Sequence, residues 1–98
     1  MPDYKLTEPA KKDLREISAY TKKTWGKEKE KAYREILRAA LRVIAKAPKI
    51  GQKRDELAEG LRSFPVGNHI AYYVEKGKLI EIARIFHPSM DREKAMKR

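Results

Sequence analysis

Two stretches of the chain repeat apolar residues at helical spacing, and both predict amphipathic helices. The first helix is expected to start at Thr7 to Pro9, a hydroxyl, an acid and a proline, and to end at Gly26. Pro48 and Gly51 end the second. Its apolar positions are Tyr33, Ile36, Leu37, Ala40, Leu41, Ile44 and Ala47, and its opposite stripe is Lys27, Lys31, Arg34, Arg38, Arg42 and Lys46. The pattern predicts a helical hairpin with a basic outer face.

Outside this hairpin the apolar positions alternate with a period of two, which indicates strands. Residues 1–6 form the first expected strand. Residues 61–66 form a second, and Pro65 within it indicates an edge or a bulge. Residues 69–74 and 79–87 then form a hairpin of two long strands, while residues 52–60 are charged and are expected to be an irregular surface connection.

The resulting order is strand, helix, helix, strand, strand, strand, which predicts one α+β domain over residues 1–98. An N-terminal strand, a helical hairpin and antiparallel strands would form one sheet packed against the helices. Ser89, after Pro88, is expected to cap a short C-terminal helical segment. The residues expected to face the helices are Ile70, Tyr72, Ile80 and Ile82, which leaves His69, Tyr73 and His87 on the open face of the sheet.

The amino-acid composition of the chain limits the kinds of function that it can have. The 98 residues include 24 Lys and Arg, 14 Asp and Glu and no Cys, for a net charge of +10, and 41% are hydrophobic. The hydrophobic content favours a folded domain, and the missing thiols exclude disulfides, cysteine nucleophiles and thiolate metal sites. With no secretory leader and no apolar run of about 18 residues, we expect a cytoplasmic protein. The charge favours a polyanionic or acidic partner.

Candidate catalytic residues are few. His69, Tyr73 and His87 could form an acid and base cluster suited to RNA cleavage, or they could be ordinary sheet residues. We expect no metal site, because Asp91 near His87 adds too few ligands.

Arg84 alternates with Ile82 and Phe86, which are expected to face the helices. A buried arginine needs a carboxylate, and Asp13 or Glu16 on the first helix could supply it. The alternative is that Arg84 contacts a partner.

The basic stripe of the second helix is either a solvated surface or a surface for phosphates or a partner. No aromatic residue interrupts it, so base stacking is not expected there. Tyr20, Trp25 and Tyr33 near the helix junction are expected to pack in the core or within the helical hairpin rather than contact a ligand.

An ordered series of short strings, covering essentially the whole chain, resembles the ParE toxins of the RelE/ParE superfamily. The strings are Ala10-x-x-Asp13-Leu14-x-x-Ile17-x-x-Tyr20 with Trp25-Gly26, then Pro48-x-x-Gly51, then Gly-Leu-Arg-Ser-Phe-Pro-Val-Gly-Asn-His over 60–69, then Ile-Ala-Arg-Ile-Phe-His-Pro-Ser-Met-Asp over 82–91. The order of the strings is more specific than any one of them.

This resemblance implies the toxin of a type II toxin–antitoxin system, which inhibits DNA gyrase by binding, stabilises plasmids and is neutralised by a cognate antitoxin in a hetero-oligomeric complex. For this chain we expect action by binding rather than enzymatic activity, with no catalytic residue, no cofactor and no metal. For gyrase binding we expect His87, Met90, Asp91, Arg92, Lys94, Lys97 and Arg98. For antitoxin binding we expect Trp25, Arg34, Arg38, His69 and Tyr73.

The superfamily also contains ribosome-dependent mRNA nucleases, and this defines the alternative function. His69 matches a position where these nucleases carry a basic residue, but Ser89 and Ala95 stand where they carry an arginine and a tyrosine. Loss of two such groups should cost several orders of magnitude in cleavage. The alternatives are a degenerate nuclease using His69, Tyr73 and His87, and a relative that only binds its antitoxin.

Overall fold

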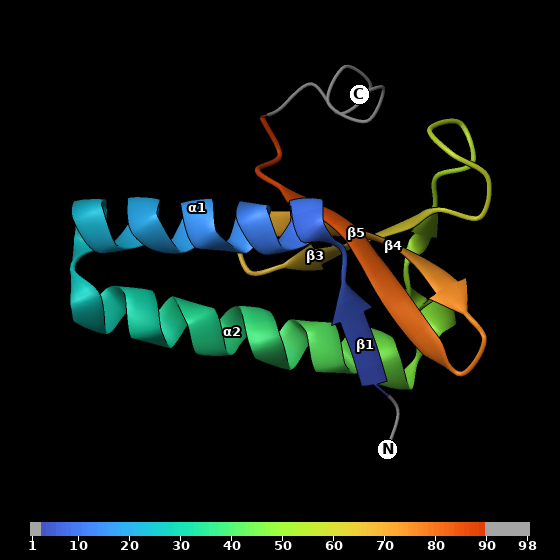
Figure 1. Ribbon diagram of the computed structural model, residues 1–98, viewed down its shortest axis with the longest axis horizontal. Helices are drawn as coiled ribbons and strands as arrows, with labels where there is room; N and C mark the ends of the chain where they lie inside the picture. The colour runs from blue at the N-terminus through green and yellow to red at the C-terminus, as the bar shows by residue number, and fades with distance from the viewer. Residues whose placement is uncertain (1–2, 90–98) are drawn as a thin grey trace.

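The computed structural model describes residues 3–89 and contains two helices packed on one face of a five-stranded sheet (Figure 1). The elements are β1 (Asp3–Leu6), α1 (Glu8–Trp25), α2 (Lys27–Lys46), the 3-10 turn η1 (Pro48–Ile50), β2 (Gln52–Lys53), β3 (Arg62–Val66), β4 (His69–Lys76) and β5 (Leu79–Phe86). The strand order in the sheet is β1-β5-β4-β3-β2. The predicted fold class is confirmed, and the predicted C-terminal helical segment lies outside the described residues.

The helix boundaries follow from the residues that the sequence indicated. The Thr7 side chain accepts a hydrogen bond of 3.1 Å from the backbone N–H of Ala10, which caps the start of α1. Gly26 separates the helices with a φ of 95°, a conformation that favours glycine, and its N–H bonds the Lys22 carbonyl. The chain therefore reverses direction at this residue and forms the expected hairpin.

Strand β1 joins the sheet in a direction that the sequence did not indicate. It pairs in parallel with β5, from Asp3 opposite Leu79 to Leu6 opposite Ile82, while all other pairs in the sheet are antiparallel. Parallel neighbours need a crossover connection, and the chain between β1 and β5, including both helices, provides it. Pro65 lies on β3 beyond the reach of β2, so the predicted edge position is confirmed.

The predicted faces of β4 are wrong. Ala71 and Tyr73 pack into the core beneath the helices, whereas Ile70, Tyr72 and Val74 lie on the other face. A bulge accompanies this arrangement, because Tyr72 lies opposite Arg84 while Tyr73 lies opposite Ile82. Both faces of β4 are apolar, since Leu57 and Leu61 cover the second one, so alternation alone cannot show which face the helices cover.

Tyr73 therefore belongs to the core and not to the open face. Its side chain is fully buried, its hydroxyl donates to the Pro48 carbonyl at 2.7 Å, and it accepts from the Gly51 N–H at 2.9 Å. A Cβ at Gly51 would collide with this hydroxyl, which explains the glycine after η1. Burial raises the pKa of Tyr73, so the hydroxyl stays protonated and holds the end of α2 against the sheet.

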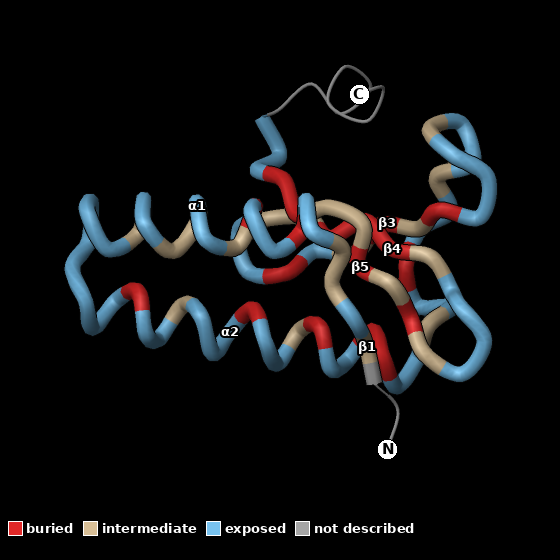
Figure 2. The backbone as a smooth tube through the Cα atoms, in the orientation of Figure 1, coloured by how far each residue is buried: buried red, intermediate tan, exposed pale blue. Residues whose placement is uncertain are grey.

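The helical hairpin is longer than the sheet that it covers. The connection between α1 and α2 lies well away from the strands (Figure 1), and that end of the hairpin is mostly exposed, whereas buried positions concentrate where helices and strands meet (Figure 2). The end of the hairpin that extends past the sheet therefore exposes side chains that a longer sheet would cover.

Candidate functional site

Two grooves lie along the seam between α1 and α2, one on each flank. They share Ile17, Thr21 and Tyr33, which lie in the seam itself. We call the first the aromatic groove; it has a volume of about 760 Å³, and its distinctive lining is Tyr20, Trp25, Lys29, Ala32, Ile36, His69 and His87. We call the second the basic groove; it has a volume of about 670 Å³, and its distinctive lining is Leu14, Arg15, Lys22, Arg34, Leu37, Arg38 and Leu41.

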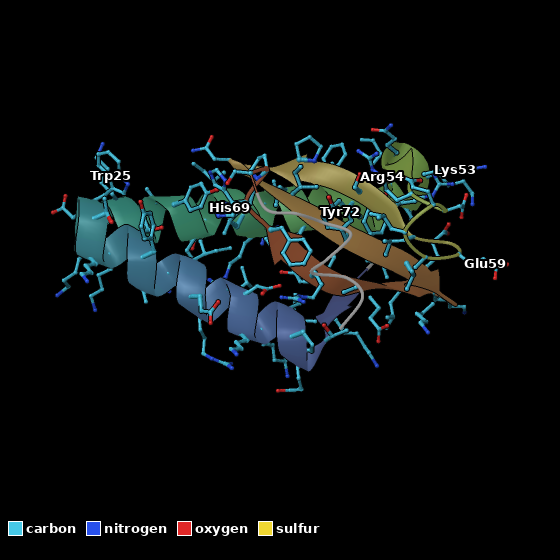
Figure 3. The ribbon with its side chains drawn as sticks, turned by 90° about the horizontal axis from the view of Figure 1, so that it is seen from above. Trp25, Lys53, Arg54, Glu59, His69 and Tyr72 are labelled. Atoms are coloured by element: carbon cyan, nitrogen blue, oxygen red, sulfur yellow. The ribbon has the colours of Figure 1, made fainter. Side chains whose placement is uncertain are left out.

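The aromatic groove exposes large apolar side chains. Tyr20 is 67% exposed, Trp25 is 65% exposed and Ile36 is 51% exposed. Figure 3 shows Trp25 at the end of the hairpin, far from the sheet. The prediction that Tyr20 and Trp25 pack in the core is wrong, because the helices extend past the strands that would have covered them. Tyr33 is partly buried against the core, as expected.

Tyr33, His69 and His87 form a hydrogen-bonded and stacked cluster at the sheet end of this groove. The Tyr33 hydroxyl accepts from the Asn68 N–H at 2.8 Å and lies 2.6 Å from His69 Nδ1. We infer that its single proton is donated to Nδ1, which places the His69 ring proton on Nε2. The His87 ring meets the His69 ring edge to face, with centroids 5.6 Å apart.

The environment of Tyr33 and His69 favours the neutral form of both side chains. Burial, and then the neighbouring His87, lower the pKa of His69. Burial raises the pKa of the Tyr33 hydroxyl. His69 thus points toward α2 and not onto the open face of the sheet, which corrects the predicted placement. Tyr73, the third member of the predicted acid and base cluster, is not in contact with either histidine and lies in the core.

Arg84 and Asp13 form the ion pair that the sequence predicted, with Asp13 rather than Glu16 as the bonded partner. Two guanidinium nitrogens of Arg84 donate to the carboxylate at 2.8 and 2.9 Å, and the same carboxylate accepts from the Ile85 N–H at 2.9 Å. Asp13 is buried, and its hydrogen bonds raise the pKa of Arg84. β1 ends opposite Ile82, so Asp13 satisfies a β5 backbone group that β1 does not reach.

The basic groove has apolar walls and charged rims. Leu37 and Leu41 are buried at its floor, and Leu14 is partly buried beside them. Within residues 3–89 neither Arg15 nor Lys22 forms an ion pair. The other two rim cations do, because Arg34 pairs with Glu30 at 3.1 Å and Arg38 with Glu35 at 3.6 Å.

Among the described residues, Glu30 is the one carboxylate that lines the basic groove. It is buried and accepts hydrogen bonds from Ser18 at 2.7 Å and from Arg34 at 3.1 and 3.2 Å. The Ser18 hydrogen bond, followed by Arg34 and then Lys22, lowers the pKa of Glu30. Glu30 therefore joins α1 to α2 as an anion, and its charge is already compensated.

The structure divides the predicted antitoxin-binding residues between three places. Trp25 and His69 line the aromatic groove, Arg34 and Arg38 line the basic groove, and Tyr73 is buried in the core. Tyr20, Ile36, Arg15 and Lys22 were not predicted. The spacing of Arg15 and Lys22 could have indicated them, because residues seven positions apart lie on the same face of a helix.

Of the predicted gyrase-binding residues, only His87 is described, and it lines the aromatic groove. The others, Met90, Asp91, Arg92, Lys94, Lys97 and Arg98, lie outside the described residues. Among residues 3–89 there is no group of three or more His, Cys, Asp or Glu side chains that could hold a metal ion. Neither helix in the described part of the chain combines the length and apolar character needed to span a bilayer.

This architecture places the chain among small α+β proteins in which a helical hairpin covers one face of a sheet. The family described as "ParE toxin of type II toxin-antitoxin system, parDE" matches residues 4–92. The chain belongs to the ParE toxin family.

Relatives and a solved structure agree with this assignment. The chain is 36% identical over 91 residues to Toxin ParE1 of Caulobacter vibrioides, covering 93% of this chain and 94% of the relative. It is 33% identical over 89 residues to Toxin ParE1 of Mycobacterium tuberculosis, covering 90% and 91%. A chain of the "Chromosomal ParDE TA system from P. aeruginosa" superposes with a TM-score of 0.75 at 25% identity, covering 89% of this chain and 96% of that one.

Proposed function

We propose that this ParE-family toxin acts in the cytoplasm by binding DNA gyrase and blocking it, that a cognate antitoxin neutralises it, and that the pair stabilises the plasmid or chromosomal segment that carries it. The fold and the family support a toxin of a toxin–antitoxin system. Inhibition by binding means that the toxin has a higher affinity for one gyrase state than for the others.

The observation that favours binding over RNA cleavage is the placement of Tyr73. A general acid or base must reach a reacting atom, and the Tyr73 hydroxyl is buried and occupied by Pro48 and Gly51. His69 has its Nδ1 engaged by Tyr33 and a lowered pKa, so it is a poor proton donor at neutral pH. The burial of Tyr73 and the neutral form of His69 therefore support binding over RNA cleavage.

The antitoxin is proposed on the basis of family and surface together. The structural neighbour is part of a ParDE system, and this chain offers two grooves that a wrapping tail could follow. We expect the antitoxin to be encoded beside the toxin, with a DNA-binding N-terminal part.

Two assays run on the same preparation test this proposal. Purified toxin should inhibit gyrase supercoiling of relaxed plasmid, should leave mRNA on translating ribosomes intact, and should lose its inhibition when the adjacent antitoxin is added. Cleavage of mRNA without an effect on supercoiling would establish the nuclease alternative. If the toxin neither inhibits gyrase nor cleaves mRNA but still binds the antitoxin, it is a relative that only binds its antitoxin.

Removal of residues 90–98 sharpens the same test, because most of the predicted gyrase-binding residues lie there. The truncated toxin should lose gyrase inhibition and keep its affinity for the antitoxin. Equal inhibition by both forms would contradict the assignment of Arg92, Lys94, Lys97 and Arg98 to gyrase.

A further inference from the structure

We propose that Tyr33 and His69 are positioning residues for gyrase binding, because they fix, through His87, the direction in which the chain leaves the sheet toward residues 90–98. The inference rests on the proposed function for the identity of the target, and on contacts among the described residues for the positioning. It separates His69 from the antitoxin-binding residues predicted from the sequence, and it gives Tyr33 a role that the sequence did not indicate.

The backbone pairing between β4 and β5 ends just before His87. The last pair is Ile70 opposite Phe86, and the next two residues, His69 and His87, lie opposite each other beyond it. Pro88 has no N–H with which to extend the pairing. From His87 onward, side-chain contacts rather than pairing with β4 therefore hold the described chain.

The His87 ring is bonded to Ser89, the last described residue. The Ser89 N–H donates to His87 Nδ1 at 3.2 Å, and the Ser89 hydroxyl oxygen lies 2.8 Å from the same nitrogen. The rotamer of His87 therefore sets the direction of the chain at Ser89. Among residues 3–89, the ring that packs against this exposed side chain is that of His69, with centroids 5.6 Å apart and an interplanar angle of 85°.

His69 is in turn held by α2 through Tyr33. The Tyr33 hydroxyl lies 2.6 Å from His69 Nδ1 and accepts from the Asn68 N–H at 2.8 Å, so one side chain bonds two successive residues. Gly67 lies so close to the Tyr33 ring that a Cβ at this position would be 2.7 Å from a ring carbon. The turn between β3 and β4, and His69 with it, is thus fixed to a side chain of α2 that packs against the core.

A continuous series of contacts therefore joins α2 to Ser89, and its members are Tyr33, His69 and His87. Residues 90–98, which contain most of the predicted gyrase-binding residues, begin at the next position. A binding segment whose start is already oriented loses less conformational entropy when it binds. Tyr33 and His69 thus raise the affinity for gyrase without contacting it.

A double-mutant cycle tests whether His69 acts through His87. In a titration of DNA gyrase with purified toxin, His69→Ala should bind about tenfold more weakly than the parent, because the His87 rotamer is no longer restricted. The double variant His69→Ala/His87→Ala should bind no more weakly than His87→Ala. A merely structural contribution of His69 would add its own loss to that of His87→Ala, and additive losses would overturn the proposal.

A second comparison removes one hydroxyl and leaves the packing in place. Tyr33→Phe breaks the hydrogen bond to His69 and keeps the ring against Gly67. Tyr20→Phe is the matched control, because Tyr20 lines the same groove and is 67% exposed. Tyr33→Phe should weaken gyrase binding about fivefold, and Tyr20→Phe should stay within about twofold of the parent. Equal affinities of the two variants would overturn the role of Tyr33.

The backbone amide of Ser89 gives a readout that does not require gyrase. Its NMR order parameter should be lower in His69→Ala and in Tyr33→Phe than in the parent, and it should be unchanged in Tyr20→Phe. An amide that is equally ordered in all of these proteins would overturn the proposal. The melting temperature of each variant shows that it is folded at the assay temperature.

The outcomes distinguish this inference from the proposed function. If the parent binds gyrase and the His69 and Tyr33 variants bind it equally well, the proposed function stands and the positioning role is wrong. If the parent does not bind gyrase, the proposed function is wrong. The Ser89 amide then decides whether Tyr33 and His69 orient the end of the sheet, because its order parameter falls in the variants only if they do.

Discussion

The basic and aromatic grooves lie along the same pair of helices, yet the helices contribute opposite kinds of side chain to them. The basic groove combines a buried leucine floor with four cations, whereas the aromatic groove combines exposed aromatic side chains with an ion pair that is already satisfied. Each helix therefore has three faces: a core face, a charged flank and an apolar flank. One short hairpin can present two chemically distinct surfaces because the two flanks diverge from a shared seam.

The largest expected difference between the grooves concerns stability, at two neighbouring positions of α2. Leu37 at the floor of the basic groove is 4% exposed, and Ile36 in the aromatic groove is 51% exposed. Leu37→Ala should lower the free energy of unfolding by about 3 kcal/mol, because it leaves a cavity in the core. Ile36→Ala should change it by less than about 0.5 kcal/mol. Urea unfolding of both variants measures this, and similar losses would mean that the aromatic groove is also part of the core.

The next largest effect is expected at the ion pair in the wall of the aromatic groove. Asp13→Ala leaves the Arg84 guanidinium and the Ile85 N–H without their acceptor. Because Arg84 keeps some contact with solvent, we expect a loss of about 2 kcal/mol in the free energy of unfolding. The control Arg15→Ala removes a charge in the basic groove that forms no ion pair within the described residues, and it should leave stability nearly unchanged. A comparable loss in the control would contradict the distinction between structural and free cations.

Acidification should affect the aromatic groove through His69. Its pKa in the folded protein is lowered from the ordinary value of 6.5, so the unfolded chain binds a proton more readily than the folded one. Stability should therefore fall as pH decreases below about 6.5, the pKa of an unperturbed histidine. His69→Gln should flatten this part of the profile of melting temperature against pH. An unchanged profile would mean that the pKa of His69 is the same in the folded and the unfolded protein.

The smallest effect is expected in the fluorescence of Trp25, the single tryptophan of the chain. Because Trp25 is 65% exposed in the folded protein, its emission maximum should move little when the protein unfolds in urea. Trp25→Ala should change the free energy of unfolding by less than about 0.5 kcal/mol. A large red shift on unfolding would mean that the indole is shielded from water in the folded protein.

The sequence predicts local features of this fold well and long-range placement less well. Thr7 and Gly26 set the limits of α1, and Arg84 required a carboxylate, because capping, chain reversal and buried charge are properties of single residues and their immediate partners. The prediction of which face of β4 lies against the helices is wrong, because Tyr72 and Tyr73 are equally suited to burial. No pattern in the sequence indicates the bulge at this position.

The exposure of Trp25 was missed for a different reason. Helical spacing shows that a residue shares a face with the core residues, but it does not show how far the covering sheet extends. The distance between the helix connection and the strands is a tertiary property, and so the grooves could not be located from the periodicity of α1 and α2.

The parallel pairing of β1 with β5 has a consequence for the order in which the protein is made. The Thr7 hydroxyl bonds the Ala83 carbonyl, 76 positions later, and Asp13 bonds Arg84 and Ile85, so β1 and α1 make their contacts with β5 only after nearly all of the chain has been synthesised. A polypeptide that is released early lacks β5 and cannot dock α1 onto the sheet. Incomplete translation products should therefore fail to assemble the native sheet, and only a chain that includes β5 should reach the folded state.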